Sequence, residues 1–264
     1  MSEYIVSLPM YDWPELQSHN DHFYDQLKAS LKERGFETPE ALERTRDRQE
    51  VWQSNQLLLS QTCGLPLVTS LENKVSLIGT PAYGVDCGAG SYYSVIVVHN
   101  DSTLEKLDDL KGKIFAYNEK GSQSGYAALL HTLSFIENAP EHFTRSVPSG
   151  AHRESIKFVA DRRADFAAID AVTWELALRH EPAAEKIRVI TYSEPTPTLP
   201  FITAMRSPRE LDMLHMAVVD AMVGLDEATR EALLLIGFSP TQITDYQVIQ
   251  DRLNIVRETF GSNY

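Results

Sequence analysis

The stretch Ile114-Phe115-Ala116-Tyr117, with Gly121-Ser122-Gln123-Ser124-Gly125 shortly after it, decides the fold of this chain. The first four residues are typical of a buried strand, and the apolar segment 126–137 predicts a helix after the loop. Such a loop places main-chain N–H groups and serine hydroxyls at one point, where the helix dipole adds partial positive charge. We therefore expect Ser122, Gln123 and Ser124 to bind an anion. The alternative is a plain helix cap made by a serine, and the absence of a following Gly-Lys-Ser/Thr excludes a Walker phosphate loop.

Strands and helices alternate on both sides of this loop. Strands are predicted at 4–8, 57–60, 75–80, 92–99, 114–117, 166–170, 187–190 and 201–205, with helices between most of them and after the last strand. This alternation indicates an α/β fold with mainly parallel sheets.

The order of these elements predicts two lobes. The alternation of helices and strands starts again near residue 100, and three prolines between 195 and 200 predict a stiff, extended connection back to the first lobe. We expect a first lobe of residues 1–99 and 201–264, and a second lobe, 100–200, inserted into it through two strand-like crossings. A ligand would lie between the lobes, where strand ends and helix N-termini converge.

The composition argues against several classes of partner. A net charge of −13 over 264 residues, without a cluster of Lys and Arg, argues against nucleic acid. No run of about 18 apolar residues exists, so no membrane insertion is predicted. The start of the chain has no basic region, and Pro9 breaks its short apolar stretch, which is unlike a signal peptide. The expected location is the periplasm if a leader was removed and the cytoplasm otherwise.

The two cysteines, Cys63 and Cys87, allow two interpretations. One is a disulfide in an exported protein, and the other is a pair of buried free thiols. Two lone cysteines lack the paired spacing of a zinc site. We therefore expect no metal, and no cofactor-anchoring residues can be identified.

Four segments, taken in order, resemble one known family. They are 61–64 (Gln-Thr-Cys-Gly), 107–113 with 122–126, 149–155 (Ser-Gly-Ala-His-Arg-Glu-Ser) and 165–170 (Asp-Phe-Ala-Ala-Ile-Asp). Together they are similar to the phosphate/phosphonate-type solute-binding proteins of ABC transporters. The resemblance implies a type II periplasmic-binding-protein clamp, two α/β lobes joined by a two-strand hinge. It also implies that the Ser-x-Ser turn grips a phosphonate or similar oxyanion, and that a transporter permease is a partner.

Other candidate ligand contacts follow strand ends in the first lobe and at the hinge. Tyr11 can line the cleft with its ring and hydroxyl, or pack on the surface near Pro14. Gln61 and Thr62 stand at a strand-to-helix turn and offer donors. Alternation in a strand predicts that Tyr92 and Tyr93 face opposite ways, and we expect Tyr93 to reach the ligand.

The second lobe offers three further candidates. His152 and Ser155 precede or begin a helix and could complete an oxyanion cage, which protonation of the histidine would strengthen. Asp170 ends an apolar strand, where a carboxylate suits a ligand ammonium or hydroxyl. Its alternative role is to cap the helix that runs through Trp174.

Binding is the favoured function, and two alternatives remain. One is an enzyme in which Cys63 is the nucleophile, His152 the base and Asp170 its orienter. No nucleophile elbow surrounds Cys63. The other alternative is a cytoplasmic ligand sensor of the same fold.

Overall fold

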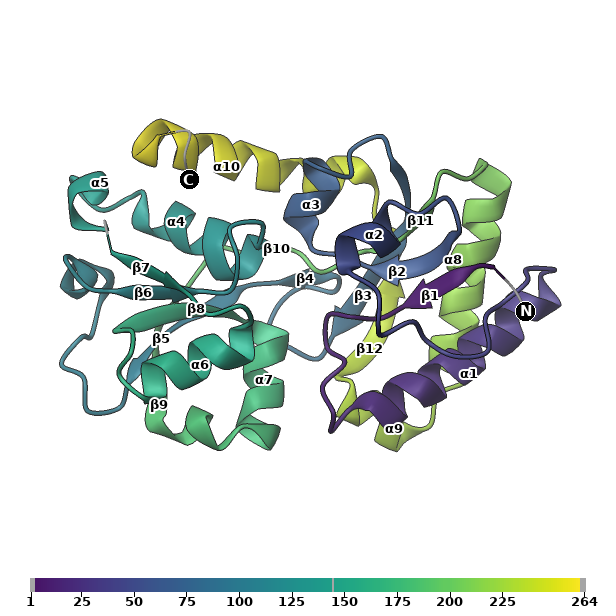
Figure 1. Ribbon diagram of the computed structural model, residues 1–264, viewed down its shortest axis with the longest axis horizontal. Helices are drawn as coiled ribbons and strands as arrows, with labels where there is room; N and C mark the ends of the chain where they lie inside the picture. The colour runs from purple at the N-terminus through teal and green to yellow at the C-terminus, as the bar shows by residue number, and fades with distance from the viewer. Residues whose placement is uncertain (1–2, 144, 262–264) are drawn as a thin grey trace. The chain divides into compact units, whose positions relative to one another are not determined.

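The computed structural model describes residues 3–143 and 145–261, which form two compact units (Figure 1). The first unit comprises the chain up to Ser91 together with Pro197–Tyr246. The second comprises Tyr92–Thr196 together with the chain from Gln247 onward. Each unit has a five-stranded sheet covered by helices, which is the expected α/β architecture.

The sheet of the first unit has the order β1-β2-β11-β3-β12. Its strands are β1 (Ile5–Ser7), β2 (Leu57–Gln61), β3 (Val75–Tyr83), β11 (Phe201–Ala204) and β12 (Leu235–Ser239). β1 and β2 are parallel, whereas β11 runs antiparallel to both β2 and β3, and β12 antiparallel to β3. The carboxyl ends of β1, β2 and β3 therefore lie at the same edge of the sheet.

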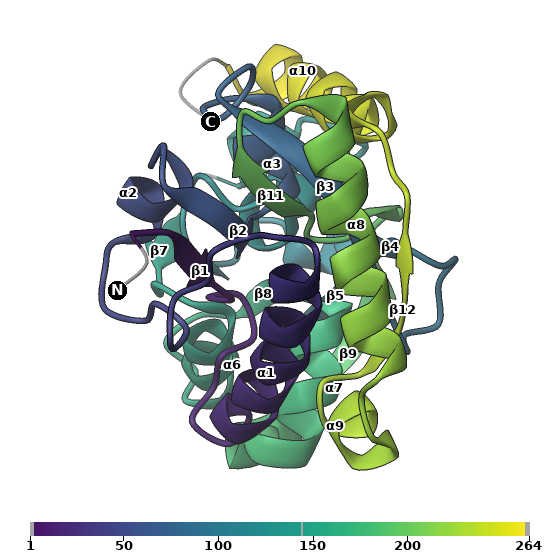
Figure 2. The ribbon, with the colours of Figure 1, turned by 90° about the vertical axis from the view of Figure 1, so that its right-hand side faces the viewer.

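Helices α1 (Gln17–Glu33) and α8 (Pro208–Val223) lie side by side in the first unit (Figure 2). α1 buries the periodic residues Phe23, Leu27 and Leu31, as its sequence pattern predicts. α8 begins with a capping box in which Ser207 and Glu210 bond each other's main chain. The remaining helices of this unit are α2 (Arg48–Trp52), α3 (Gly64–Val68), α9 (Glu227–Ala232) and the 3₁₀ turn η4 (Ile243–Tyr246).

The sheet of the second unit has the order β7-β6-β8-β5-β9. Its strands are β5 (Ser94–His99), β6 (Phe115–Tyr117), β7 (Ser146–Pro148), β8 (Phe166–Asp170) and β9 (Ile187–Tyr192). β6 pairs in parallel with β7 and β8, and β5 pairs antiparallel with β8 and β9. The helical segments are η1 (Leu107–Leu110), η2 (Gln123–Ala127) with α4 (Ala128–Leu133), α5 (Ala139–His142), α6 (His152–Ala160), α7 (Ala171–His180), η3 (Pro182–Lys186) and α10 (Gln247–Phe260).

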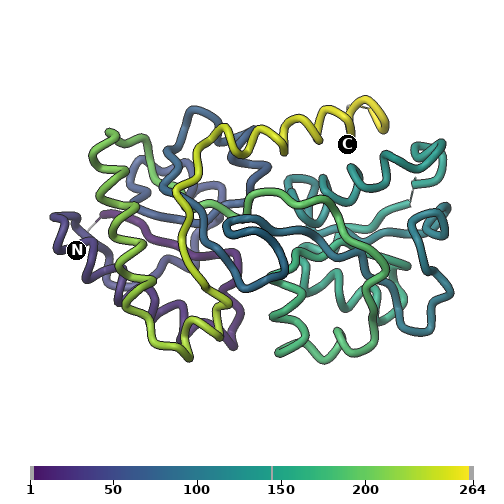
Figure 3. The backbone as a smooth tube through the Cα atoms, turned by 180° about the vertical axis from the view of Figure 1, so that it is seen from behind, coloured from purple at the N-terminus to yellow at the C-terminus, as the bar shows by residue number. Residues whose placement is uncertain are grey.

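The C-terminal helix does not lie in the unit expected from the sequence. The sequence places residues 201–264 in the first lobe, but α10 packs against α4 and α5 of the second unit (Figure 3). Its apolar residues Val256 and Phe260 enter the core of that unit with Phe115 and Leu133. The chain therefore passes between the units three times, and the first two passages pair as β4 (Ser91–Tyr92) and β10 (Thr196–Pro197).

Three smaller expectations were wrong. The sheets are mixed rather than mainly parallel, since each contains antiparallel pairs. The chain after β11 is not only helical, because β12 pairs with the far half of β3. The predicted strand 92–99 is interrupted at Tyr93, which lies between β4 and β5.

Candidate functional site

The candidate site lies at one edge of the second unit's sheet. β6, β7 and β8 run parallel, so their carboxyl ends meet at this edge. A helical segment begins after each of them: η2 with α4, then α6, then α7. The loop after β7 is fastened to the end of β6, since the N–H groups of Ser149 and Gly150 donate to the carbonyls of Tyr117 and Asn118. Three helix N-termini, with their partial positive charges, are thereby gathered at one edge.

The Gly121–Gly125 stretch forms the first of these N-termini. The helix begins at Gln123 as a π-helical turn and continues into α4, three residues before the start predicted from the sequence. Ser122 is its cap, with Oγ accepting a hydrogen bond from the N–H of Gly125 at 3.0 Å. The capping alternative is confirmed for Ser122. Ser124 is buried inside the first turn, where its hydroxyl is not used as a cap.

Ser124, His152 and Asp170 come together at this edge, one from each of the three helix starts. The Oγ atom of Ser124 lies 2.8 Å from Nε2 of His152, and Oδ2 of Asp170 lies 3.4 Å from the same nitrogen. Asp170 is also the cap of α7, where its Oδ1 accepts from the N–H of Thr173 at 2.8 Å. The capping role considered for this residue is therefore confirmed, and its second oxygen faces the histidine.

Burial determines the charge of this cluster. Only 13% of the His152 side chain is exposed and 3% of the Asp170 side chain. Burial lowers the pKa of His152, and the Asp170 carboxylate offsets only part of that effect. The neighbouring Arg153 is engaged in an ion pair with Glu181 at 2.7 Å. The donors offered by the described residues of this cluster are thus hydroxyl and N–H groups rather than ammonium or guanidinium groups.

Gly125 permits this arrangement because it has no side chain. A Cβ atom at this position would lie 2.0 Å from Oδ1 of Asn118 and 2.9 Å from Cε1 of His152. Both distances are well below ordinary van der Waals contact. Sequence reasoning treated this glycine as part of a turn and missed that the imidazole packs directly over it.

The other predicted residues of the second unit have defined positions. Gln123 is buried in the first turn of η2. Ser155 is fully buried, and its hydroxyl bonds that of Ser149 at 2.6 Å, which secures the turn before α6. Tyr92 is buried, whereas Tyr93 is partly exposed and its ring meets the edge of Tyr192 at a centroid distance of 5.4 Å. Their ligand roles remain predictions.

The predicted residues of the first unit lie at the carboxyl edge of its sheet. The amide of Gln61 donates to the hydroxyl of Tyr83 at 2.8 Å and to the carbonyl of Leu199 at 3.2 Å. Tyr11 places its ring against Tyr83 in an edge contact of 5.4 Å, and Thr62 is fully buried. Tyr11 and Gln61 line a cavity of about 20 Å³, which has room for roughly one water molecule. The side-chain amide of Gln61 therefore holds the Tyr83 hydroxyl in place, and it donates to acceptors within the first unit.

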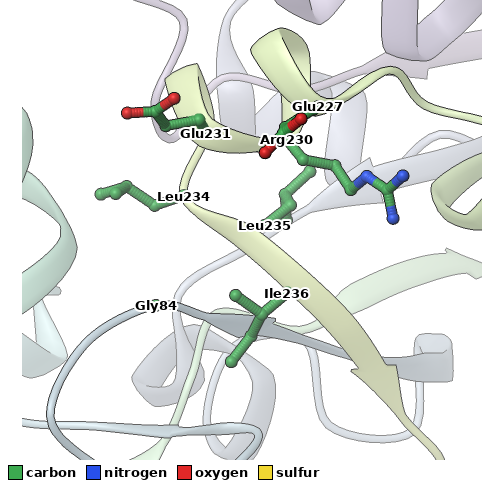
Figure 4. A pocket seen from close by; sticks show the side chains of 7 residues that line it. All are labelled: Gly84, Glu227, Arg230, Glu231, Leu234, Leu235 and Ile236. Carbon is green, nitrogen blue, oxygen red and sulfur yellow. The ribbon is translucent and has the colours of Figure 1, made fainter.

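An open hollow of about 640 Å³ lies beside that edge, between α9 and the start of β12 (Figure 4). Its polar lining is Glu227, Arg230 and Glu231 of α9, and its apolar lining includes Leu234 and Ile236. In Figure 4, the Arg230 and Glu231 side chains point to opposite sides of the hollow. Two carboxylates against one guanidinium make this hollow less suited to an oxyanion than the edge of the second unit.

The cysteines decide between the two interpretations of the sequence. No disulfide joins Cys63 and Cys87, so the disulfide interpretation is wrong; both side chains are half-buried, rather than buried as the other interpretation expects. Within residues 3–143 and 145–261, no group of three His, Cys, Asp or Glu side chains could hold a metal ion. Over the same residues, no helix is both long and apolar enough to span a bilayer.

Comparison with known proteins agrees with this geometry. The family described as "ABC transporter, phosphonate, periplasmic substrate-binding protein" matches residues 6–251. Solved structures with the same fold include a binding protein component of an ABC phosphonate transporter from Pseudomonas aeruginosa. It is 15% identical, with a TM-score of 0.75 over 100% of this chain and 90% of that one. PhnD1 from Prochlorococcus marinus, in complex with methylphosphonate, is 16% identical, with a TM-score of 0.68 over 97% and 100% of the two chains. A Xanthomonas citri protein bound to ATP is 17% identical, with a TM-score of 0.71 over 98% of each chain.

Proposed function

Because the chain belongs to the family of periplasmic substrate-binding proteins of phosphonate ABC transporters, we propose that its second unit captures the oxyanion of a phosphonate or phosphate-like ligand. The observation that carries the proposal is the meeting of Ser124, His152 and Asp170 at the edge where three helical segments begin. Helix N-termini and hydroxyl donors bind oxyanions without a fixed positive charge. Ser122, Gln123 and Ser124 would supply donors from the first turn of η2, and His152 and Ser155 would flank them from α6.

We also propose Tyr11, Gln61 and Thr62 of the first unit as ligand-binding residues. Tyr11 and Thr62 follow strand ends at its carboxyl edge, and Gln61 fixes the neighbouring Tyr83 hydroxyl. Tyr93 follows β4 and is partly exposed, which suits an aromatic wall for the organic part of a ligand. We propose that the loaded protein works in the periplasm and delivers its ligand to a permease of the ABC type.

Binding is favoured over catalysis by the geometry of the cluster. In a Ser–His–Asp relay, the acid contacts the ring nitrogen opposite the one that faces the serine. Here Ser124 and Asp170 approach the same nitrogen, Nε2. Asp170 therefore does not orient the ring from Nδ1 and leave Nε2 free to take the serine proton, as the acid of such a triad does, and the arrangement suits the holding of a hydrogen-bond acceptor.

Calorimetric titration with methylphosphonate, 2-aminoethylphosphonate, phosphate and sulfate tests the proposal. We expect at least one phosphorus oxyanion to bind and to raise the melting temperature, since a ligand at about 100 times its Kd stabilises by roughly 2.7 kcal/mol. Ser124→Ala should weaken that binding by about 1–2 kcal/mol, or roughly 5- to 30-fold.

Ser134→Ala is the matched control for Ser124→Ala. Ser134 stands at the other end of the same helix and bonds the carbonyl of Leu130, so its loss should leave the affinity unchanged. The proposal fails if none of the phosphorus oxyanions binds, or if the two serine variants bind equally well.

A further inference from the structure

One ring nitrogen of His152 faces both an alcohol and a carboxylate. Nε2 lies 2.8 Å from Oγ of Ser124 and 3.4 Å from Oδ2 of Asp170. A hydroxyl can either donate or accept, but an ionised carboxylate can only accept. The position of the imidazole hydrogen therefore decides in which direction the Ser124 hydroxyl points.

The two possible tautomers have opposite consequences for Ser124. With the hydrogen on Nε2, the ring donates to Asp170 and Ser124, and the serine keeps its own hydrogen for another acceptor. With the hydrogen on Nδ1, the Nε2 lone pair faces the carboxylate, and the serine hydrogen is consumed by the ring. In the second case Ser124 presents only lone pairs to an approaching oxyanion, which repel it.

The surroundings of the ring favour the first tautomer. Asp170 is held in place, since its Oδ1 accepts from the Thr173 N–H and its side chain is buried at the cap of α7. Nδ1 of His152 is buried and makes no hydrogen bond of regular geometry to a described residue, although the main chain of Ala168 acts to raise the pKa of the ring. A hydrogen on Nδ1 would thus lack a well-directed acceptor, whereas a hydrogen on Nε2 has two acceptors within reach.

We propose that Asp170 is a positioning residue for ligand capture: its carboxylate keeps the hydrogen of His152 on Nε2, so that Ser124 directs its own hydrogen to the ligand oxyanion. This role rests on the proposed function and adds to it a residue that does not itself touch the oxyanion. It also changes the expected task of Asp170, which the sequence assigned to a ligand ammonium or hydroxyl. Because burial keeps the imidazole largely uncharged at neutral pH, the ring carries a single hydrogen there, and its location matters.

Asp170→Asn is the informative substitution because it separates capping from positioning. Asparagine caps helices about as well as aspartate, so α7 should keep its start. Its amide, however, can donate to Nε2 and stabilise the Nδ1–H tautomer, which reverses the Ser124 hydroxyl. We expect Asp170→Asn to weaken methylphosphonate binding by about 5- to 30-fold, the range that a lost hydrogen bond produces. The double variant that carries both Asp170→Asn and Ser124→Ala should bind no more weakly than Ser124→Ala alone, because both substitutions act through the Ser124 hydroxyl.

Nitrogen-15 NMR of the labelled imidazole reads the tautomer directly at neutral pH. We expect a protonated Nε2 in the ligand-free wild-type protein and an unprotonated Nε2 in Asp170→Asn. Asp226→Asn is the matched control, because Asp226 also caps a helix, α9 of the first unit, through the Thr229 N–H, and its Oδ2 lies 3.1 Å from Nε2 of a different imidazole, that of His22. It should change neither the His152 signals nor the affinity.

Three outcomes would overturn the inference: a wild-type ring with its hydrogen on Nδ1, an unchanged tautomer in Asp170→Asn, or unchanged binding by that variant. Failure of the proposed function looks different. In that case the wild-type protein binds none of the phosphorus oxyanions. The role of Asp170 in ligand capture is then refuted too, even where the NMR comparison shows that it sets the tautomer.

Discussion

Replacement of Gly125 by alanine tests the packing on which the site depends. In a helix, alanine is favoured over glycine by about 1 kcal/mol, so propensity alone predicts stabilisation. The new Cβ, however, would lie 2.9 Å from Cε1 of His152, a ring held by Ser124 and Asp170, and 2.0 Å from Oδ1 of Asn118. Overpacking of this kind costs about 1–3 kcal/mol. The net expectation is a loss of up to about 2 kcal/mol, or up to roughly 8 °C in Tm for a chain of this size.

The assay combines urea unfolding with titration of methylphosphonate. We expect Gly125→Ala to lower both the unfolding midpoint and the affinity, the latter by more than about tenfold if the ring moves from Ser124. Gly121→Ala is the control, since a Cβ there meets nothing within 4 Å. Asn118→Ala combined with Gly125→Ala removes one of the two overlaps and should restore stability only in part. The reasoning is refuted if Gly125→Ala is as stable as the wild type and binds equally well.

Two further predictions concern stability. Burial lowers the pKa of both His131 and His152 from the ordinary 6.5, so the unfolded chain binds more protons below that pH. The free energy of unfolding should therefore be constant above about pH 6.5 and fall as the pH is lowered toward about 5. Measured by urea unfolding, this fall should be smaller in His131→Gln than in the wild type. An equal fall in both proteins would contradict the contribution of His131. The buried Tyr246 hydroxyl donates to the carbonyl of Thr198 at 2.8 Å and bonds the hydroxyl of Thr80 at 2.7 Å. Tyr246→Phe should therefore lower the free energy of unfolding by about 1–3 kcal/mol in the same urea assay. The same change at the exposed Tyr192 is the control and should leave stability almost unchanged.

The elements that bear the second unit's site could be predicted from the sequence because they are local. The apolar run at 166–170 is buried throughout and the run at 114–117 at its two central residues, and such runs are typical of central strands. Parallel strands bring their carboxyl ends to one edge, so the neighbourhood of Ser124, His152 and Asp170 follows from the order of the elements. The hydrogen-bond roles of these residues do not follow, because they depend on distances of a few tenths of an ångström.

The errors concern long-range packing. β12 is short, contains a glycine and is half-exposed, so neither its alternation nor its composition distinguishes it from a turn. Its identity as a strand comes from pairing with β3, about 150 positions earlier in the chain. α10 shows an apolar stripe at Ile249, Leu253 and Val256, but a stripe does not specify which core it covers.

The last prediction concerns how salt changes the affinity for the ligand, and it follows from the net negative charge of the chain. The 37 acidic and 24 basic side chains give a net charge of −13, and Asp170 and Glu119 add negative potential near His152. An oxyanion therefore approaches against a repulsive field that salt screens beyond about 10 Å at 0.1 M. The hydroxyl and N–H donors act at contact distance and are screened much less. We expect the Kd for methylphosphonate to fall by about twofold as ionic strength rises from about 10 to about 150 mM, with potassium chloride and potassium fluoride giving the same trend. A Kd that rises with salt would indicate a Lys or Arg in direct contact with the oxyanion, and would contradict a site built from uncharged donors.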